Sequence, residues 1–189
     1  EKSIENIIFS SSASIYGEEN FSPIKETSSL AANNPYAQTK IYIEQFINDS
    51  VRSGDIKRAI NLRYFNPVGA HTSGLIGENP LNRPTNIMPI ICKVAKKEQD
   101  ALKIFGDDYE TADGTGVRDY IHIQDLALGH VSALNKIFPG DNFLGVENIN
   151  LGTGIGYSVL DLVNTFEEVN KVKVPYTICN RREGDIASA

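Results

Sequence analysis

Strand-like and helix-like segments alternate along this chain, and that alternation restricts its fold more than any other feature. Short β-branched runs fit strands, and longer segments with apolar residues three and four positions apart fit helices. Such a pattern is typical of a parallel sheet wrapped by helices. Gly54 stands where the first helix should end, because glycine readily adopts the left-handed conformation of a C-cap. The expected strands are residues 6–10, 58–65, 103–105, 117–121, 147–151 and 174–178, and the expected helices are residues 35–53, 87–97, 123–136 and 158–170.

The first expected strand ends in a cluster of hydroxyl groups. Its apolar residues Ile7, Ile8 and Phe9 lead directly into a run of serines that includes Ser12. Ligands of open α/β sheets gather at the carboxyl ends of parallel strands. A hydroxyl group placed there is therefore a candidate functional group.

Tyr36 and Lys40 lie four residues apart in the next expected helix, so they share one face. A fixed ammonium favours phenolate over phenol, which brings a tyrosine that ordinarily ionises near pH ~10 closer to use as a base. On many helices, however, a pair at this spacing only covers the surface. Proton transfer becomes the better interpretation because a strand-end hydroxyl precedes the pair.

A strand-end hydroxyl followed by a Tyr-x-x-x-Lys helix resembles the catalytic set of the extended branch of the short-chain dehydrogenase/reductase superfamily. Within that branch, four further stretches resemble the UDP-glucose 4-epimerase family, whose members interconvert UDP-glucose and UDP-galactose. The stretches follow the order of that family from end to end of the chain. They are residues 62–71 (LRYFNPVGAH), 86–89 (NIMP), 113–122 (DGTGVRDYIH) and 181–185 (RREGD).

The resemblance implies an α/β fold: an NAD-binding Rossmann-type, doubly wound parallel sheet, present in part, with a smaller α/β substrate-binding domain. We expect residues 1–66 to form the C-terminal part of the NAD-binding domain and residues 67–189 mainly the UDP-sugar cap. Residues of about 116–136 are expected to return to the NAD-binding domain. The family begins with a strand, a glycine-rich turn and a helix that hold the dinucleotide pyrophosphate. This chain starts at the strand before the serines, so we expect a fragment without that first half.

Residues 149–156 (INLGTGIG) form a glycine-rich segment that could be mistaken for a dinucleotide fingerprint. The spacing is Gly-x-Gly-x-Gly, and no acidic residue follows about 20 positions later. We interpret the segment as a structural turn before a helix that Ser158 caps, with Asp161 in the first turn.

The resemblance also implies the chemistry and the residues that carry it. Tyr36 is the base that takes the proton of the hexose C4 hydroxyl while hydride passes from C4 to NAD. Lys40 keeps the phenol acidic and holds the nicotinamide ribose, Ser12 hydrogen-bonds the same sugar oxygen, and Phe65 lies against the nicotinamide. The 4-ketose then turns over and receives the hydride on its other face. Ser12 and Tyr36 thus contact both substrate and cofactor, and Lys40 and Phe65 contact the cofactor.

Binding should be concentrated on the UDP group, because a pocket that gripped the sugar firmly would hold one epimer only. Arg118 and Arg182 are the candidates for the diphosphate, since a guanidinium offers phosphate two parallel donors. Without the resemblance, a solvated position on the surface would be a more common role for either arginine than phosphate binding. By resemblance the other substrate-binding residues are Asn66, Asn86, Ile87, Phe105, Tyr120, Asp185 and Ala189.

Ala189 falls at a family position beside the hexose, where a bulky side chain is expected to restrict the pocket. A methyl group there suggests that N-acetylated sugars are admitted. UDP-N-acetylglucosamine 4-epimerisation is therefore an alternative activity.

Composition excludes several kinds of partner. The 189 residues carry a net charge of -6 with the basic residues spread along the chain, which argues against a nucleic-acid partner, and no apolar run is long enough for a membrane span.

Cys92 and Cys179 lack metal-ligand spacing, so we expect them to be reduced core residues of a cytoplasmic protein. His71, His122 and His130 are too scattered for a metal site, and packing or loop hydrogen bonds are expected of them.

Three interpretations compete. A sugar-nucleotide 4,6-dehydratase shares the Tyr-x-x-x-Lys pair, but that family needs an acid pair beside the strand-end hydroxyl, and Ala13 follows Ser12 here. A noncatalytic nucleotide-sugar-binding remnant would explain the missing glycine-rich half. We favour an incomplete piece of an epimerase, which by itself should bind NAD poorly and show no turnover. For the whole enzyme, the resemblance implies a homodimer formed through helices that include the Tyr36 helix.

Overall fold

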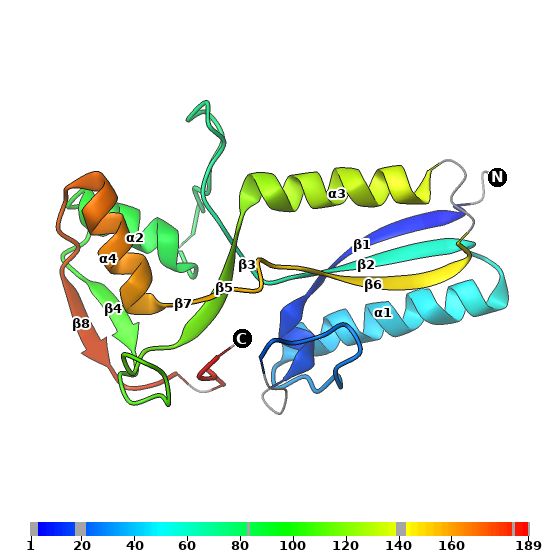
Figure 1. The fold of residues 1–189 in the computed structure, drawn as a ribbon, viewed down its shortest axis with the longest axis horizontal. Helices are drawn as coiled ribbons and strands as arrows, with labels where there is room; N and C mark the ends of the chain where they lie inside the picture. Colours follow the sequence, from blue (N-terminus) through cyan, green and yellow to red (C-terminus); the bar gives the residue numbers. More distant parts are fainter. Residues whose placement is uncertain (1–3, 18–21, 83, 139–142, 183, 189) are drawn as a thin grey trace.

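A three-stranded parallel sheet forms one end of the molecule in the computed structural model, which describes residues 4–17, 22–82, 84–138, 143–182 and 184–188 (Figure 1). The strands are β1 (Asn6–Ser12), β2 (Arg58–Tyr64) and β6 (Gly145–Leu151), in the order β1-β2-β6. Helix α1 (Pro35–Ser53) covers one face of this sheet and α3 (Ile123–Ile137) covers the other. The expected helix-wrapped parallel sheet is confirmed.

The central strand β2 provides most of the core at this end. Ile60 and Leu62 are buried against Ala133 and Ile137 of α3. Full burial of side chains of this size stabilises a fold by about 1.5–3 kcal/mol each. The core fixes α3 against the sheet and leaves the carboxyl ends of the strands at the middle of the molecule (Figure 1).

Helix α1 begins and ends where the sequence predicts. The Asn34 side chain accepts a hydrogen bond from the Ala37 N–H at 2.9 Å, and Pro35 occupies the first turn, where a missing N–H costs little. Gly54 is the C-cap, in the left-handed conformation with a φ of 88°. These caps set the start of the helix close to Tyr36.

The other end of the molecule holds two smaller sheets. In one, β3 (Asn66–Val68) runs parallel to β5 (Val117–His122), and β7 (Gly156–Ser158) is antiparallel to β5. In the other, β4 (Leu102–Phe105) runs parallel to β8 (Tyr176–Cys179).

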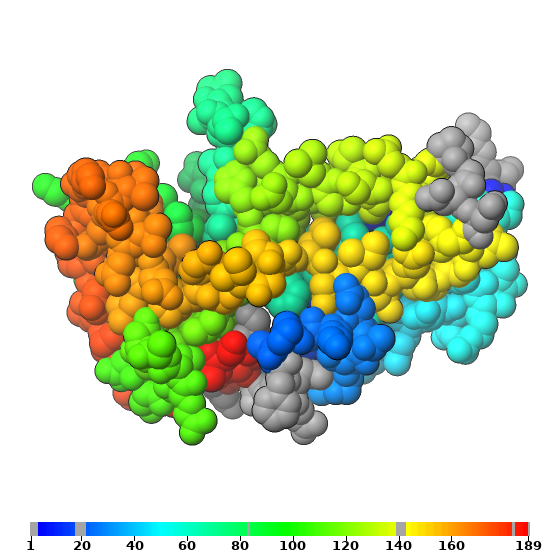
Figure 2. All heavy atoms as spheres, in the orientation of Figure 1, coloured from blue at the N-terminus to red at the C-terminus, as the bar shows by residue number. Residues whose placement is uncertain are grey.

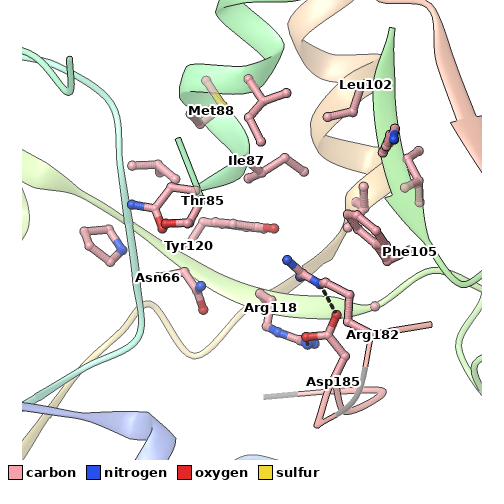
Figure 3. Close-up of a pocket in the computed structure, with 18 of the residues that line it drawn as sticks. Asn66, Thr85, Ile87, Met88, Leu102, Phe105, Arg118, Tyr120, Arg182 and Asp185 are labelled. Carbon is pink, nitrogen blue, oxygen red and sulfur yellow. Dashed lines mark hydrogen bonds and ion pairs between the residues drawn. The ribbon is translucent and has the colours of Figure 1, made fainter. Parts of the chain in front are cut away.

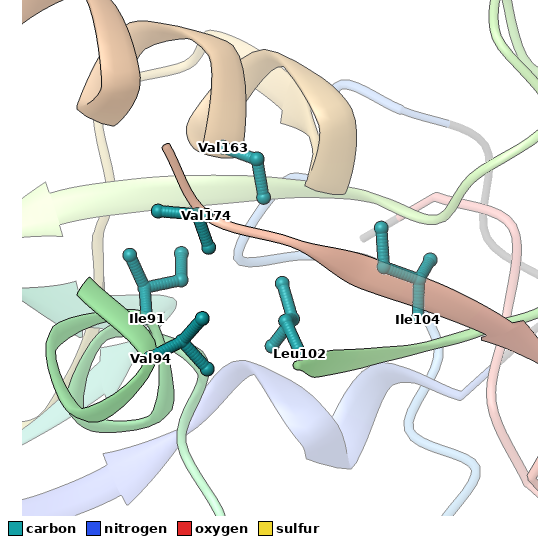
Figure 4. Packing of buried hydrophobic residues seen from close by; sticks show 6 residues of the cluster. All are labelled: Ile91, Val94, Leu102, Ile104, Val163 and Val174. Atoms are coloured by element: carbon teal, nitrogen blue, oxygen red, sulfur yellow. The ribbon is translucent and has the colours of Figure 1, made fainter. Parts of the chain in front are cut away.

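Helices α2 (Ile87–Ala95) and α4 (Val159–Asn170) pack beside β4 and share a core with it (Figure 4). All six side chains of that core are at most 3% exposed. They come from both helices, from β4 and from the segment before β8, and they are Ile91, Val94, Leu102, Ile104, Val163 and Val174. This core is separate from the one around β2, so each end of the molecule is stabilised by its own apolar cluster.

Two strands of the structure have no counterpart in the sequence prediction. β3 consists of Asn66, Pro67 and Val68, and β7 begins at Gly156. Proline and glycine weaken any local strand signal, and three residues are too few to show a period. Pairing with β5 alone makes both segments extended.

Of the later elements, α3 and β6 lie with the first sheet, whereas β5, at the start of the expected returning segment 116–136, pairs with β3 and β7. After α3, strand β6 pairs with β2 along its whole length, up to Tyr64 opposite Leu151. Helix α3 and strand β6 therefore both lie with β1 and β2.

The glycine-rich turn between β6 and β7 is structural, as expected. Asp119 is buried, and its carboxylate accepts hydrogen bonds from the N–H groups of Thr153 and Gly154 at 2.7–2.9 Å. Ser158 then caps α4 in a capping box with Asp161. The turn thus holds a buried carboxylate of its own chain.

The cysteines are less buried than predicted. Cys92 is exposed and Cys179 is partly buried, and both are free thiols. The placement in the core was wrong, because the buried face of α2 is formed by Ile91 and Val94, and Cys92 points away from it.

The end of the described chain folds back to the middle of the molecule. Figure 2 shows the last residues (red) between the loop of residues 107–115 (green) and residues 22–33 (blue). The Val117 N–H donates to the Ala187 carbonyl at 2.8 Å, which fixes this segment beside β5. Among the described residues, no helix combines the length and apolar character needed to cross a bilayer.

Candidate active site

Lys40 connects the Tyr36 helix to the end of β1. The Lys40 ammonium donates a hydrogen bond to the Ser10 carbonyl at 2.9 Å. The same nitrogen lies 5.4 Å from the centre of the Tyr36 ring and 5.1 Å from that of Phe9. The expected approach of ammonium and phenol is thus present. Tyr36 is 57% exposed, so the residue is accessible to a ligand.

Ser12 ends β1 and caps a 3-10 helix of residues Ala13–Tyr16. Its oxygen accepts hydrogen bonds from the Ser14 N–H at 3.2 Å and the Ser14 hydroxyl at 2.9 Å. Both contacts use Ser12 as an acceptor, so its own proton is available to a ligand. Ser12 and Tyr36 make no hydrogen bond to one another in the part of the chain that the structure describes.

A cavity of about 210 Å³ lies at the end of β1. Ser12 and Phe65 line it together with Asn66 and Arg118. Phe65 is held by its N–H, which donates to the Leu151 carbonyl at 3.0 Å. The cavity therefore joins two candidate catalytic and cofactor residues to two candidate substrate residues.

A second cavity, of about 300 Å³, brings together the remaining candidates for the nucleotide (Figure 3). It lies between β3, β4, β5, the start of α2 and the segment after β8. Such a volume is at the lower end of the range for small-molecule sites. All eight described substrate residues that the resemblance adds to Ser12 and Tyr36 line it: Asn66, Asn86, Ile87, Phe105, Arg118, Tyr120, Arg182 and Asp185.

Two guanidinium groups share one carboxylate in this cavity. Arg182 donates to Asp185 at 2.8 Å, and Arg118 lies 3.9 Å from the other oxygen of the same carboxylate (Figure 3). Arg182 also lies over the Phe105 ring, 4.7 Å from its centre. Because two cations face a single anion, the group carries a net positive charge that can accept phosphate.

Tyr120 and Asn86 form other parts of the wall. Burial raises the pKa of the Tyr120 phenol, with Arg118 acting in the opposite direction, so the phenol is neutral. The Asn86 amide donates to the Glu78 carboxylate at 2.6 Å and makes no cap hydrogen bond to α2. The first N–H groups of α2, from Ile87 onward, therefore remain without that side-chain cap.

Several residues beside these cavities were not predicted from the sequence. Tyr64, on the end of β2, donates to Ser10 at 2.6 Å and lies 2.5 Å from His130 Nε2. Tyr109 is buried in the wall of the nucleotide cavity, under the guanidinium of Arg181, within the acidic run of residues 107–110. The aromatic residue within the acidic run was the one available signal.

The three histidines make loop and packing contacts, as expected. His71 is hydrogen-bonded with Ser73 in the loop before α2, and His122 accepts from the Gln124 N–H at the start of α3. His130 contacts Tyr64. Ala189, expected beside the hexose, lies outside the described residues.

The chain belongs to the NAD dependent epimerase/dehydratase family, whose model matches residues 1–152. Over 98% of its length it is 51% identical to the UDP-glucose 4-epimerase of Bacillus subtilis and 48% identical to that of Mus musculus. The family resemblance inferred from the motifs is confirmed. These matches cover 54% and 53% of the two relatives, so the chain spans about half the length of the curated relatives it matches.

Solved structures give the same result. A UDP-glucose-4-epimerase from Stenotrophomonas maltophila, with bound NAD and formylated UDP-arabinopyranose, superposes with a TM-score of 0.91 at 48% identity. An enzyme of the same name from Bifidobacterium longum, in complex with NAD+ and UDP, gives 0.90 at 46% identity. Each match covers 97% of this chain and 54% of the other. The partial Rossmann-type fold is thereby confirmed.

Proposed function

We propose that the chain is the catalytic and substrate-binding part of an NAD-dependent UDP-glucose 4-epimerase, an isomerase of galactose metabolism. One observation carries the proposal: Asn66 and Arg118 line both the nucleotide cavity and the cavity at Ser12. A ligand with its diphosphate at Arg118 can therefore extend its sugar toward the end of β1. The similarity to epimerases of other organisms supports the same activity.

The residues at the end of β1 fit the nicotinamide half of NAD. The Lys40 ammonium and the Tyr36 phenol are suitable partners for ribose hydroxyls, and Phe65 offers an apolar surface for a planar ring. When bound, NAD accepts a hydride from the sugar C4 and later returns it. Ser12, Tyr36, Lys40 and Phe65 are accordingly the proposed cofactor contacts.

Tyr36 is the proposed base for the C4 hydroxyl of the hexose. The Lys40 ammonium lies 5.4 Å from the centre of its ring. The Ser12 hydroxyl can donate a hydrogen bond to the same sugar oxygen, which holds that oxygen in place for proton transfer to Tyr36. General-base assistance of this kind commonly contributes about 10²–10⁴ to the rate.

The nucleotide cavity holds the UDP group in this proposal. Arg118 and Arg182 bind the diphosphate, with further donors from Asn66, Asn86 and the N–H of Ile87 at the start of α2. Phe105 lies against the uracil, Tyr120 lines the same region, and Asp185 accepts from a ribose hydroxyl. Few polar contacts are then left for the hexose, so the 4-ketose is free to turn over.

The test is whether the full-length protein turns over UDP-galactose in the presence of NAD, with the product measured by chromatography. Interconversion with UDP-glucose without net NADH formation supports the proposal. UDP binding without any interconversion by the NAD-loaded full-length protein would favour the noncatalytic alternative instead. The chain alone is expected to bind UDP and to bind NAD poorly.

The partners and the domain division are part of the same proposal. The outer face of α1 exposes Tyr42, Ile43 and Phe46, and we assign it to a homodimer of the whole enzyme. Residues 1–66, with the returning segment, form the NAD-binding side, and the rest of residues 67–189 forms the cap. A cytoplasmic enzyme that acts on a UDP-hexose, without nucleic acid or membrane partners, agrees with the composition.

A further inference from the structure

A buried ion pair lies behind the candidate catalytic residues. Glu44 of α1 and Arg63 of β2 form two hydrogen bonds: Nε donates to Oε1 at 3.0 Å and Nη2 to Oε2 at 2.7 Å. Their side chains are only 4% and 3% exposed, respectively. The geometry is the bidentate one in which an arginine fork matches a carboxylate. It directly joins the Tyr36 helix to the central strand.

Further hydrogen bonds extend this pair to β1 and to the loop before α1. Ser11 donates to Glu44 at 2.6 Å. The other guanidinium nitrogen of Arg63 donates to the Tyr16 hydroxyl at 2.9 Å and to the Glu26 carbonyl at 3.0 Å. One network thus connects α1, β1, β2 and two loop segments.

The network is charged at its centre and neutral at its edge. Burial alone would lower the pKa of Arg63, but the hydrogen bonds to Glu44 and Tyr16 raise it above its ordinary value, so the guanidinium keeps its proton. Burial raises the pKa of the Tyr16 phenol, against the effect of Arg63. Tyr16 therefore remains a neutral phenol, which donates to the Asn150 amide oxygen at 2.6 Å.

The network is attached to the same two elements that carry the candidate catalytic groups, α1 and β1. Tyr36, Lys40 and Glu44 are spaced four residues apart, so they form one stripe along α1. Ser11, which donates to Glu44, is the neighbour of Ser12. A rotation or a shift of α1 relative to β1 would break the network and would displace Tyr36 from the end of β1.

Stability alone does not account for such a pair. Removing two charges from water is costly, and replacing a buried ion pair with apolar residues of similar size is often neutral or stabilising. A fork that accepts only one geometry, however, selects one register between the elements that it joins. A positioning function explains the pair better.

We propose that Glu44 and Arg63 are positioning residues, which hold α1 in the register that places Tyr36 and Lys40 over the end of β1. The proposal rests on the proposed epimerase function for its kinetic consequence. Its structural consequence is independent of that function, because contacts between Lys40 and Phe9 report the register directly.

The first test replaces the polar centre with apolar side chains, as Glu44→Met, Arg63→Met and Ser11→Ala together. We expect a thermal midpoint within a few degrees of the wild type. The nuclear Overhauser effects between the Lys40 Hε protons and the Phe9 ring should weaken or disappear. In the NAD-loaded full-length protein, kcat should fall at least tenfold, while the Kd for UDP stays within twofold because none of these residues lines the nucleotide cavity.

A second variant, Arg63→Lys, keeps the charge and loses the fork. We expect a kcat about tenfold lower, weaker Lys40–Phe9 effects and an unchanged Kd for UDP. Glu5→Met with Lys57→Met is the matched control, since it removes an exposed ion pair of 2.6 Å at the other end of β1. That control should change neither kcat nor the Lys40 contacts.

Wild-type values of kcat and of the Lys40–Phe9 effects in Arg63→Lys would overturn the proposal, whatever the apolar variant does. If the wild-type protein itself shows no turnover, the proposed function fails. The register measurement still decides the positioning inference in that case.

Discussion

The two candidate regions differ in how their residues are distributed along the chain. Ser12, Tyr36 and Lys40 come from a strand end and the helix that follows it. The eight substrate candidates that line the nucleotide cavity come from five separate segments between Asn66 and Asp185. Local spacing therefore describes the catalytic group, whereas only packing between distant segments creates the cavity.

The regions also use charge differently. Behind the candidate catalytic residues, Glu44 and Arg63 are buried and form a bidentate ion pair. In the cavity, Arg118 and Arg182 share one carboxylate, and Arg182 is half exposed. The Glu44–Arg63 pair has no net charge left for a ligand, so its role is to position other groups. The two arginines of the cavity share one carboxylate, so they keep a net positive charge that can bind an anion.

The largest expected effect separates chemistry from binding. Tyr36→Phe should lower kcat by about 10²–10⁴, because it removes the proposed base, and should leave the Kd for UDP unchanged. Tyr176→Phe, at an exposed tyrosine of β8 that lines neither cavity, is the control and should keep wild-type kcat. Steady-state kinetics and UDP titration calorimetry measure both quantities. Equal kcat values for the two variants would remove Tyr36 from the mechanism.

A change in the nucleotide cavity should instead weaken the binding of UDP. Arg182→Gln should raise the Kd for UDP about tenfold, since a charged hydrogen bond contributes about 1.5–3 kcal/mol and this side chain is partly solvated. The Kd for uridine, which lacks phosphate, should change much less. Calorimetry of the chain itself with both ligands is sufficient, and Arg52→Gln, a distant exposed arginine, is the control. A parallel loss for uridine and UDP would argue against a phosphate contact.

A smaller effect is expected on sugar selectivity. Ala189→Tyr in the full-length enzyme should suppress turnover of UDP-N-acetylglucosamine, because a bulky side chain would fill the space for the acetyl group. Turnover of UDP-glucose should be spared. The ratio of kcat/KM for the two substrates is the measurement, and an unchanged ratio would eliminate broader specificity set by this position.

The smallest effect concerns the loop that borders the nucleotide cavity. Burial alone would raise the pKa of Asp113, but hydrogen bonds from Ser158 and Thr115 hold it below its ordinary value. A lowered pKa in the folded state means that the stabilisation exists above the unfolded value of about 4 and is lost as pH falls through the folded one.

Asp113→Asn should therefore lower the thermal midpoint by about 2–4 °C at pH 7. The difference from the wild type should shrink as the pH falls below about 4. Calorimetric scans across this range measure it, and a constant difference at every pH would show that the charge of Asp113 is not responsible.

The sequence predicts the long elements well and the short ones poorly. Helix α1 is predicted to the residue, and Gly54 is its C-cap as expected. β3 and β7 are missed, since their formation depends on pairing with β5. The exposure of Cys92 was misjudged for a related reason: an apolar run does not show which face of a helix is buried.

The sequence by itself determined the alternation of strands and helices, the Tyr36–Lys40 face and the motifs that indicate the family. Those features are local, because a helix turn or a strand end brings together residues that are close in the chain. Tertiary structure alone decided that Arg118, Arg182 and Asp185 meet, that Asn66 and Arg118 join two cavities, and that Glu44 and Arg63 form a buried pair. Each of those contacts depends on the packing of elements distant in sequence, and no local spacing encodes it.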